Sequence, residues 1–335
     1  MYSDPVILSR APLRVSLAGG GSDLPAFYEQ EPGQVLSFAI DKYVYIAAHD
    51  LFKGGIRLSY SKTEEVDNPD KIEHPLIRET FLETNFTQSI EIGSFADVPG
   101  TGTGLGSSSA FTVALLNGLS HLNGISDSFS DYPKYLADTA CKIEIQRCGQ
   151  MIGKQDQFAS AYGGINLIKF HTDGSTEVEN LLNDENLEDF LNKSLALFYL
   201  GFGRPGSEIL NEQSTKLKNK ENEFNSIRDL RNLVPEMRAA LNNKDHNSLG
   251  HLLTQGWQLK ASTSSSISSP EIEVAFREAL ELGALGGKVV GAGGGGFFLL
   301  ALEPGKREEF IKNFSKYRNL PFKISKSGAE IIYSD

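Results

Sequence analysis

The sequence contains few of the residue types that mark disulfide-rich or zinc-binding proteins. It has two cysteines, Cys141 and Cys148, and six scattered histidines. On the helix expected around them, two helical turns would separate the cysteines by roughly 10 Å, which is too far for a disulfide. No H-E-x-x-H motif and no Cys/His zinc spacing occurs, which argues against a transition metal held by these side chains.

Long apolar runs and an excess of basic charge are also missing. The longest apolar stretches, such as FFLLAL, are far shorter than the roughly 20 residues of a membrane-spanning helix, and MYSDPVILSR lacks the features of a signal peptide. The net charge is −11, without a basic stripe, so nucleic acid is not expected as the main partner. Any anionic ligand would need a locally positive site. These absences predict a reduced, soluble, cytoplasmic protein with no membrane association.

The length and the apolar content predict two packed domains. The chain has 335 residues, of which 40% are hydrophobic and 22% charged, enough for well-packed cores. We expect a β-rich opening, helices over about 108–122 and 132–148, a charged helical region over 185–247, and a tail of strand, glycine turn, strand, helix and strand. This order predicts an α+β protein with domains over 1–180 and 181–335. A homo-oligomer remains open.

The stretch VPGTGTGLGSSSAF, residues 98–111, lies between an expected strand and an apolar helix. Four glycines would allow close approach of the backbone to an anion, and the N-terminus of the helix offers unpaired N–H groups. The alternative is a serine-capped helix after an ordinary glycine turn. A P-loop is excluded, because G-x-x-x-x-G-K-[ST] is absent.

Two further glycine-rich turns have weaker signals when each is considered separately. APLRVSLAGGGSD, residues 11–23, places three glycines after a strand, with Arg14 and Asp23 beside them. VVGAGGGGFFLLAL, residues 289–302, formally matches G-x-G-x-x-G. However, a strand follows it rather than a helix, so a dinucleotide-binding fingerprint is rejected and a hairpin turn remains possible.

Taken together and in this order, the motifs APLRVSLAGGGSD, PGTGTGLGSSSA, GKQDQFASAYGG and KVVGAGGGGF resemble those of the GHMP small-molecule kinases over nearly the whole chain. The resemblance implies two domains, one ribosomal S5 domain 2-like and one ferredoxin-like, with the active site between them. It also implies ATP and Mg²⁺ as cofactors.

The resemblance further assigns roles to individual residues. Asp156 resembles the catalytic base, with Arg14 beside it, and Ser108 and Glu144 resemble the Mg²⁺ ligands. The expected phosphate-binding residues are Pro99, Gly100, Gly102, Gly104, Leu105, Gly106, Ser107, Ser108 and Ser109. The expected acceptor-binding residues are Gly20, Gly21, Ser22, Asp23, Arg57, Arg204, Gly293 and Gly294.

The segments LAGGGSDLPAFY and GIRLSYSKTEEVDNPDKIEHPLIRE are together closer to those of kinases acting on D-glycero-D-manno-heptose 7-phosphate than to those of mevalonate or homoserine kinases. The heptose enzymes form the 1,7-bisphosphate for bacterial surface polysaccharide. Many relatives have an acidic residue directly after the first strand, which is missing here, so Asp23 would contact a sugar hydroxyl instead. We look to Arg57, Lys53 and Arg204 for the 7-phosphate, although each could equally be a solvated surface residue.

Other functions remain open at this point. Within the family, the acceptor could be an unphosphorylated sugar such as L-fucose, galactose or an N-acetylhexosamine. A ligand sensor that has lost the chemistry is disfavoured, because Arg14, Ser108, Glu144 and Asp156 are all present. A dehydrogenase would rest only on the rejected G-x-G-x-x-G match.

Overall fold

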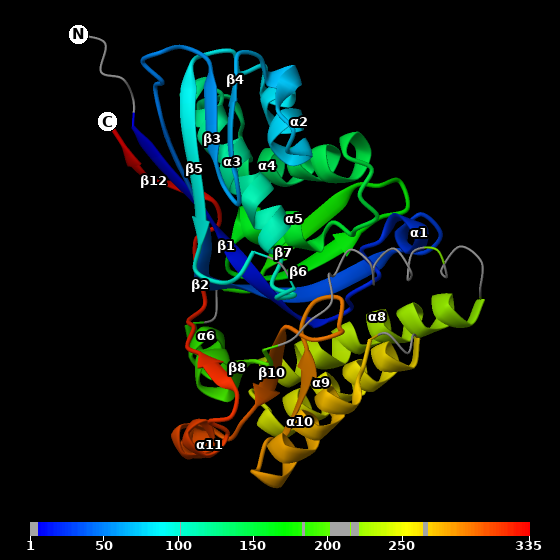
Figure 1. Cartoon of the computed structure of the whole chain (residues 1–335). Helices are drawn as coiled ribbons and strands as arrows, with labels where there is room; N and C mark the ends of the chain where they lie inside the picture. The colour runs from blue at the N-terminus through cyan, green and yellow to red at the C-terminus, as the bar shows by residue number, and fades with distance from the viewer. Residues whose placement is uncertain (1–5, 101, 183–184, 202–214, 216–220, 264–266) are drawn as a thin grey trace.

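Two β-sheets, each covered by helices, form the protein in a computed structural model (Figure 1). The structure describes residues 6–100, 102–182, 185–201, 215, 221–263 and 267–335. Each sheet together with its helices is called a layer below. The chain forms most of the first layer, then the second layer, and its last strand returns to the first. The expected α+β, two-domain architecture is confirmed.

The first layer holds an eight-stranded sheet in the order β12-β1-β2-β5-β3-β4, with β6 paired to β2 and β7 to β6. Its pairs are antiparallel except for β3 and β5, which are parallel. The strands are β1 (Ile7–Ala18), β2 (Gly33–His49), β3 (Ile56–Ser59), β4 (Thr63–Val66), β5 (Ile90–Ala96), β6 (Ile165–Phe170), β7 (Thr176–Asn180) and β12 (Glu330–Ser334).

Helix α3 is the central helix of this layer. The helices here are α1 (Pro25–Tyr28), α2 (Pro75–Thr84), α3 (Ser107–Leu122), α4 (Tyr132–Cys141) and α5 (Gln155–Tyr162). Twelve of the sixteen residues of α3 are buried, because the helix packs against β1, β2, α2, α4 and α5. A helix that is apolar on nearly every face is expected in such a position. The predicted helix over 132–148 ends earlier, at Cys141, and continues as a π-helical turn, Lys142–Arg147.

The second layer is a four-stranded antiparallel sheet in the order β11-β8-β10-β9. In chain order the strands read 4-1-3-2, as the ferredoxin-like expectation requires. The strands are β8 (Leu195–Tyr199), β9 (Gly286–Val289), β10 (Phe297–Ala301) and β11 (Arg318–Leu320). The helices are α6 (Glu185–Ser194), α8 (Glu221–Asn242), α9 (His246–Thr263), α10 (Pro270–Glu281) and α11 (Arg307–Asn313).

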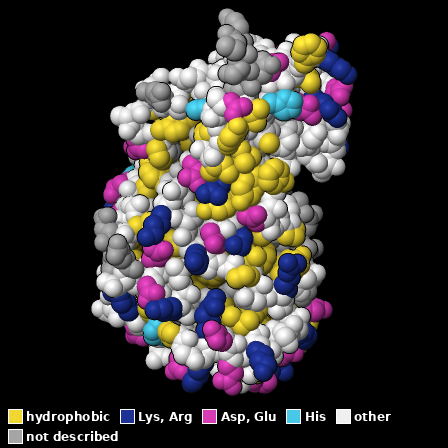
Figure 2. Space-filling view, turned by 90° about the vertical axis from the view of Figure 1, so that its left-hand side faces the viewer, with side chains coloured by type: hydrophobic (Ala, Val, Ile, Leu, Met, Phe, Trp, Pro, Cys, Tyr) yellow, Lys and Arg dark blue, Asp and Glu magenta, His cyan; other side chains and the backbone are white. Residues whose placement is uncertain are grey.

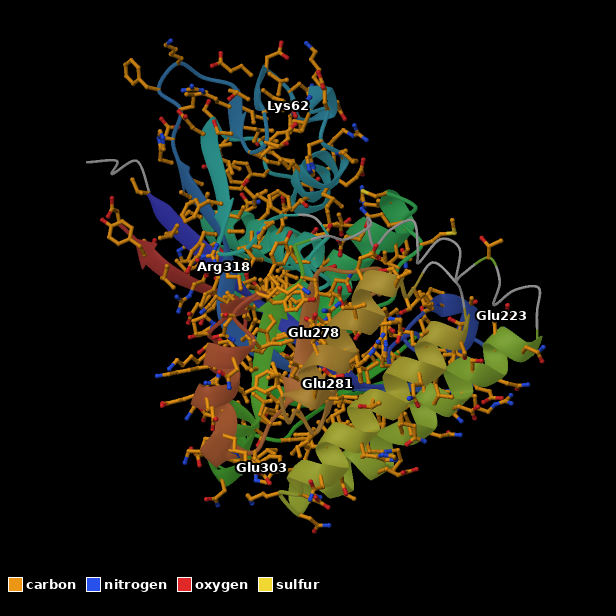
Figure 3. The ribbon with its side chains drawn as sticks, turned by 60° about the horizontal axis from the view of Figure 1, so that its bottom comes forward. Lys62, Glu223, Glu278, Glu281, Glu303 and Arg318 are labelled. Carbon is orange, nitrogen blue, oxygen red and sulfur yellow. The ribbon has the colours of Figure 1, made fainter. Side chains whose placement is uncertain are left out.

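Helices α8 and α9 lie side by side in this layer (Figures 1 and 3). Helix α10 begins as predicted, because Ser269 accepts a hydrogen bond from the N–H of Ile272 and Pro270 occupies the first turn. It buries Ile272 and Ala275 and leaves Glu281 exposed on its outer side.

The end of the chain corrects the predicted domain limits. Strand β12 pairs with β1 in the first sheet, with Arg10 opposite Glu330, and Ile324 forms a bridge with Ile40. The second unit therefore does not extend to residue 335. Pairing between strands more than 300 residues apart leaves no local signal in the sequence.

Charge and hydrophobicity of the surface agree with the composition. On the face shown in Figure 2, Lys and Arg lie interspersed with Asp and Glu rather than in a patch of one sign. Across the ranges that the structure describes, no helix combines the length and apolarity needed to cross a bilayer.

Candidate functional site

A cleft of about 580 Å³ lies where the two layers meet, and all three glycine turns line it. The first turn contributes Gly19–Gly21 after β1, the second contributes glycines before α3, and the third follows β9. The motifs that were separate in the sequence therefore converge on one cavity.

The second turn presents the N-terminus of α3 to the cleft. Gly102, Gly104 and Gly106 have φ values of 71°, 73° and 77°, which other residues rarely adopt. Gly106 is followed at once by Ser107, where α3 begins. The free N–H groups and positive end of this helix make the turn suitable for phosphate.

The third turn packs directly on the second. A Cβ atom on Gly291 would lie 2.4 Å from the Cα of Gly104, and one on Gly104 would lie 2.2 Å from the Val290 carbonyl oxygen. The N–H of Phe297 also donates to the Thr103 carbonyl at 3.3 Å. Glycine at both positions is thus needed for backbone contact, and the third turn supports the second.

Arg14 and Asp156 form a paired charge on the cleft wall. The Arg14 Nε and Nη2 atoms donate to the two carboxylate oxygens of Asp156 at 2.7 and 2.8 Å. The remaining Nη1 donates to the Gly104 carbonyl at 2.5 Å. Arg14 is 5% exposed but Asp156 is 24% exposed, so the carboxylate stays accessible from the cleft. A bidentate pair of this kind fixes both orientation and charge.

Glu144 and Ser108 meet at the N-terminus of α3. The Ser108 hydroxyl donates to a Glu144 carboxylate oxygen at 3.3 Å, and the Gln157 amide donates to the other oxygen. Glu144 is fully buried within the π-helical turn, and burial raises its pKa to about 7. Such π turns often occur at functional positions.

This pair suits Mg²⁺ chemically. Mg²⁺ prefers oxygen ligands and is commonly held by one or two protein groups together with substrate phosphates and water. A hydroxyl and a carboxylate beside a phosphate-binding turn supply such a set. Within the described ranges no cluster of three or more His, Cys, Asp or Glu residues could hold a metal, so phosphate oxygens would have to complete the coordination.

Asp23 lines the cleft but is held by the protein itself. Its carboxylate accepts hydrogen bonds from the Gly21 N–H at 2.9 Å, the Gln155 N–H at 3.2 Å and the Gln155 side chain at 3.0 Å. It is 2% exposed, and burial, followed by the nearby Asp156 carboxylate, raises its pKa. Asp23 therefore shapes the first turn and joins it to α5.

Two lysines in the cleft were missed by the sequence reasoning. Lys260 of α9 and Lys288 of β9 both line it from the second layer. Burial lowers the pKa of Lys260 to about 8. Burial, followed by Lys260 and Arg14, lowers the pKa of Lys288 to about 7. Lys288 lies two residues before the third glycine turn, and this position in the sequence could have indicated that it lines the cleft.

Most of the other residues predicted from the sequence line the cleft, and a few do not. Gly20, Gly21, Gly100, Gly102, Gly104, Gly106, Ser107, Ser108, Ser109 and Gly293 line the cleft. Three residues lie just behind its wall: Leu105 accepts from the Arg14 N–H, Ser22 bonds to Gly19 and Gln34, and Gly294 donates to Ile267. Pro99 is exposed beside the second turn.

The structure does not bring Arg57 to the cleft. Arg57 lies on β3, at the end of the first layer farthest from the second (Figure 1), and is ion-paired with Glu65 at 3.3 Å and Glu91 at 3.1 Å. Lys53 lies exposed in the preceding loop. Both choices rested on loop-like surroundings, but β3 is a strand whose neighbours supply the carboxylates. Arg204 lies outside the described residues.

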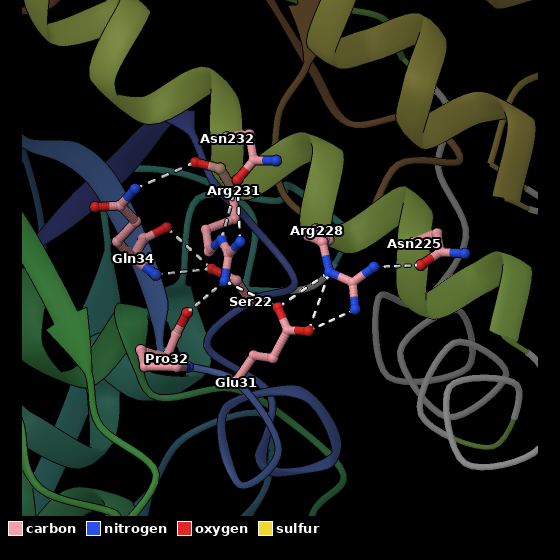
Figure 4. A network of polar contacts seen from close by, with 8 residues as sticks. All are labelled: Ser22, Glu31, Pro32, Gln34, Asn225, Arg228, Arg231 and Asn232. Carbon is pink, nitrogen blue, oxygen red and sulfur yellow. Dashed lines mark hydrogen bonds and ion pairs between the residues drawn. The ribbon is translucent and has the colours of Figure 1, made fainter.

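A polar network fastens the loop between α1 and β2 to α8 (Figure 4). Arg228 donates to both carboxylate oxygens of Glu31, and Arg231 reaches Glu31 at 3.2 Å and the Pro32 carbonyl at 3.1 Å. Beside it, Phe27 and Phe224 stack with ring centres 4.6 Å apart. These contacts hold the two sides of the cleft together.

Comparisons with known proteins agree with this geometry. Residues 75–164 match the family model described as GHMP kinases N terminal domain, and residues 237–319 match GHMP kinases C terminal. The chain is 26% identical to the D-glycero-alpha-D-manno-heptose 7-phosphate kinase of Campylobacter jejuni, with 97% of this chain and 98% of that protein covered.

A second relative and a solved structure are similar to a comparable extent. The bifunctional fucokinase/GDP-fucose pyrophosphorylase of Arabidopsis thaliana is 27% identical over 93% of this chain, which spans 31% of that protein. The crystal structure of a D-glycero-D-manno-heptose 1-phosphate kinase from Bacteroides thetaiotaomicron superposes with a TM-score of 0.76 at 25% identity, covering 98% of this chain and 99% of that one.

Proposed function

Because the chain belongs to the GHMP kinase family, whose members use ATP, we propose that it transfers the γ-phosphate of ATP to the anomeric hydroxyl of D-glycero-D-manno-heptose 7-phosphate. The products are ADP and the 1,7-bisphosphate, a precursor for bacterial surface polysaccharide. The observation that carries the proposal is the accessible Asp156 carboxylate, oriented by Arg14 between the phosphate-binding turn and the Gly19–Asp23 turn.

The chemistry follows from these positions. The anomeric oxygen forms a bond to the γ-phosphorus, the bond from that phosphorus to the β,γ-bridging oxygen breaks, and the hydroxyl proton passes to Asp156. Phosphoryl transfer depends mainly on positioning and on neutralising charge. The N-terminus of α3 supplies N–H groups for the phosphates, and Arg14 fixes the Asp156 carboxylate toward the acceptor.

Ser108 and Glu144 are the residues that would hold Mg²⁺. When bound, the ion neutralises charge on the β- and γ-phosphates. The Ser108 hydroxyl and the Glu144 carboxylate already point toward one another beside the turn.

Support for a heptose phosphate as acceptor comes from the relatives. Both the Campylobacter protein and the Bacteroides structure are described as kinases of a heptose phosphate, although their names differ in the position of that phosphate. The fucokinase relative favours a second candidate, an unphosphorylated sugar such as L-fucose.

One assay separates these candidates. ATP consumption is measured with heptose 7-phosphate, heptose 1-phosphate, unphosphorylated heptose, L-fucose and galactose, each with and without Mg²⁺. We expect turnover only with Mg²⁺ and the highest kcat/KM for heptose 7-phosphate. A higher kcat/KM for L-fucose would favour the second candidate, and no turnover of any sugar would disprove the kinase proposal.

A further inference from the structure

Two lysines line the cleft without a carboxylate partner of their own. The Lys260 amine donates to the Gly291 carbonyl, and the Lys288 amine lies 3.4 Å from the Leu17 carbonyl. No carboxylate among the described residues forms an ion pair with either. The nearest candidates are engaged elsewhere, since Asp156 is paired with Arg14 and Asp23 accepts from Gly21 and Gln155.

Such an arrangement is unfavourable unless an anion completes it. Ammonium groups removed from water are costly when no counter-charge is present. Burial lowers the pKa of Lys288 to about 7, and repulsion from Lys260 and from Arg14, a third positive charge, contributes further. The overall charge of −11 makes this local excess of positive charge distinctive.

The location of the pair indicates which anion it would bind. The ATP phosphates are expected at Gly102–Ser109 and the acceptor at the Gly19–Asp23 turn, both in the first layer, and both lysines reach the cleft from the second layer. Leu17, beside Lys288, lies two residues before the Gly19–Asp23 turn, and Asp23 is the carboxylate that acts most strongly on Lys260. Lys288 therefore borders the Gly19–Asp23 turn, and Lys260 lies between Asp23 and the third glycine turn, whose Gly291 carbonyl it contacts.

We propose that Lys260 and Lys288 together form the subsite for the phosphate group of a phosphorylated acceptor. This inference rests on the proposed function and names residues for a task that Arg57 cannot perform from β3. A phosphate monoester carries close to two negative charges at neutral pH and three acceptor oxygens. It would receive hydrogen bonds from both amines and remove their mutual repulsion.

The first test measures KM for both substrates in Lys260→Met and Lys288→Met. Charge-assisted hydrogen bonds of this kind are worth about 1.5–3 kcal/mol, so each variant should raise KM for heptose 7-phosphate about 10- to 100-fold. KM for ATP and for unphosphorylated heptose should stay within about two-fold of wild type. Lys260→Arg and Lys288→Arg should recover part of the loss, and Lys312→Met, on the exposed side of α11, is the matched control.

A rise in KM for ATP would instead assign the lysines to the nucleotide phosphates, and unchanged KM values would assign them to neither; both outcomes overturn the inference. Isothermal titration calorimetry with inorganic phosphate, without nucleotide, provides a test independent of turnover. Wild-type protein should bind one more phosphate than the double Met variant, in which the phosphate-binding turn before α3 is unchanged. If wild type fails to phosphorylate heptose 7-phosphate, the proposed function falls, and the calorimetry alone decides the subsite.

Discussion

At the scale of single residues, the proposed reaction depends most on the Arg14–Asp156 pair. The Arg14 guanidinium makes three hydrogen bonds, two to Asp156 and one to the carbonyl of Gly104. One guanidinium therefore links the carboxylate to the phosphate-binding turn. Displacement of either partner would move the base relative to the γ-phosphate, and an error of about 1 Å can cost 10²-fold in rate.

We expect Asp156→Asn to lower kcat by about 10²–10⁴-fold, because an amide cannot accept the acceptor proton. KM for ATP should change little, since the phosphates are held by the turn before α3. Steady-state kinetics on purified protein measures both constants. Asp138→Asn, an exposed change on α4, is the control. A kcat within a few-fold of wild type would show that Asp156 is not the base.

The half-buried Lys288 predicts that stability depends on pH. Lys288 has a folded pKa of about 7, below the unfolded value near 10.4. Between these values the unfolded chain binds the extra proton, so the stability of wild type gains from rising pH. Lys288→Met has no titrating group at this position. The free energy of unfolding of the variant minus that of wild type should therefore fall by up to about 1.4 kcal/mol per pH unit from pH 7 to 9.5.

Urea unfolding of both proteins at several pH values measures that difference. Lys260 and Arg14 are the charged groups that act on Lys288, while Asp23, Arg14 and Asp156 act on Lys260. Subtracting the wild-type free energy of unfolding from that of Lys288→Met cancels the titration of groups common to both proteins, such as Cys141. A difference that does not vary with pH would mean that Lys288 is charged in the folded protein throughout this range.

At the scale of elements, the three glycine turns function as one unit. Positive φ angles and backbone contacts leave no room for side chains at Gly104 and Gly291. Gly291→Ala should therefore lower the free energy of unfolding by more than about 2 kcal/mol and raise KM for ATP, because the phosphate-binding turn must shift.

Chemical denaturation and ATP kinetics test this prediction. Gly305→Ala is the matched control, since a Cβ there meets nothing within 4 Å and its φ is not positive. The control should remain within about 0.5 kcal/mol of wild type. If Gly291→Ala behaved like the control, the close packing of the second and third turns would be disproved.

The same elements explain what the sequence could and could not predict. Gly102–Ser109 and its helix were predictable, because turn, cap and apolar helix are contiguous in the chain. Lys260 was not, because a lysine in an amphipathic helix resembles any solvated lysine until tertiary packing turns it into the cleft. Arg57 was predicted to bind the acceptor phosphate, because the sequence does not show that the neighbouring strands place Glu65 and Glu91 beside it. The residues of the phosphate-binding turn follow one another in the sequence and could be recognised there. The residues of the acceptor side come together only through contacts between the layers.

At the scale of the whole molecule, one hydrophobic core extends across both layers, beside a smaller cluster that belongs to the second layer alone. A single cluster of buried residues includes Leu13 and Phe38 from the first sheet together with Val234 and Leu253 from the helices of the second layer. Strand β12 returns to β1 after the second layer is complete, and the Glu31–Arg228 contact joins the layers again (Figure 4). Separate unfolding of either layer would expose much of this core.

We therefore expect the protein to unfold in one cooperative transition. Trp257, the single tryptophan, is buried in α9 and reports on the second layer, while far-UV circular dichroism reports on both layers. In urea, the two signals should have the same midpoint, as required for all-or-none unfolding. Phe224→Ala, which removes the stack with Phe27, should shift both midpoints together to lower urea. A tryptophan transition that precedes the loss of circular dichroism would show instead that the second layer opens independently, in which case the cleft and both lysines would be lost before the first sheet.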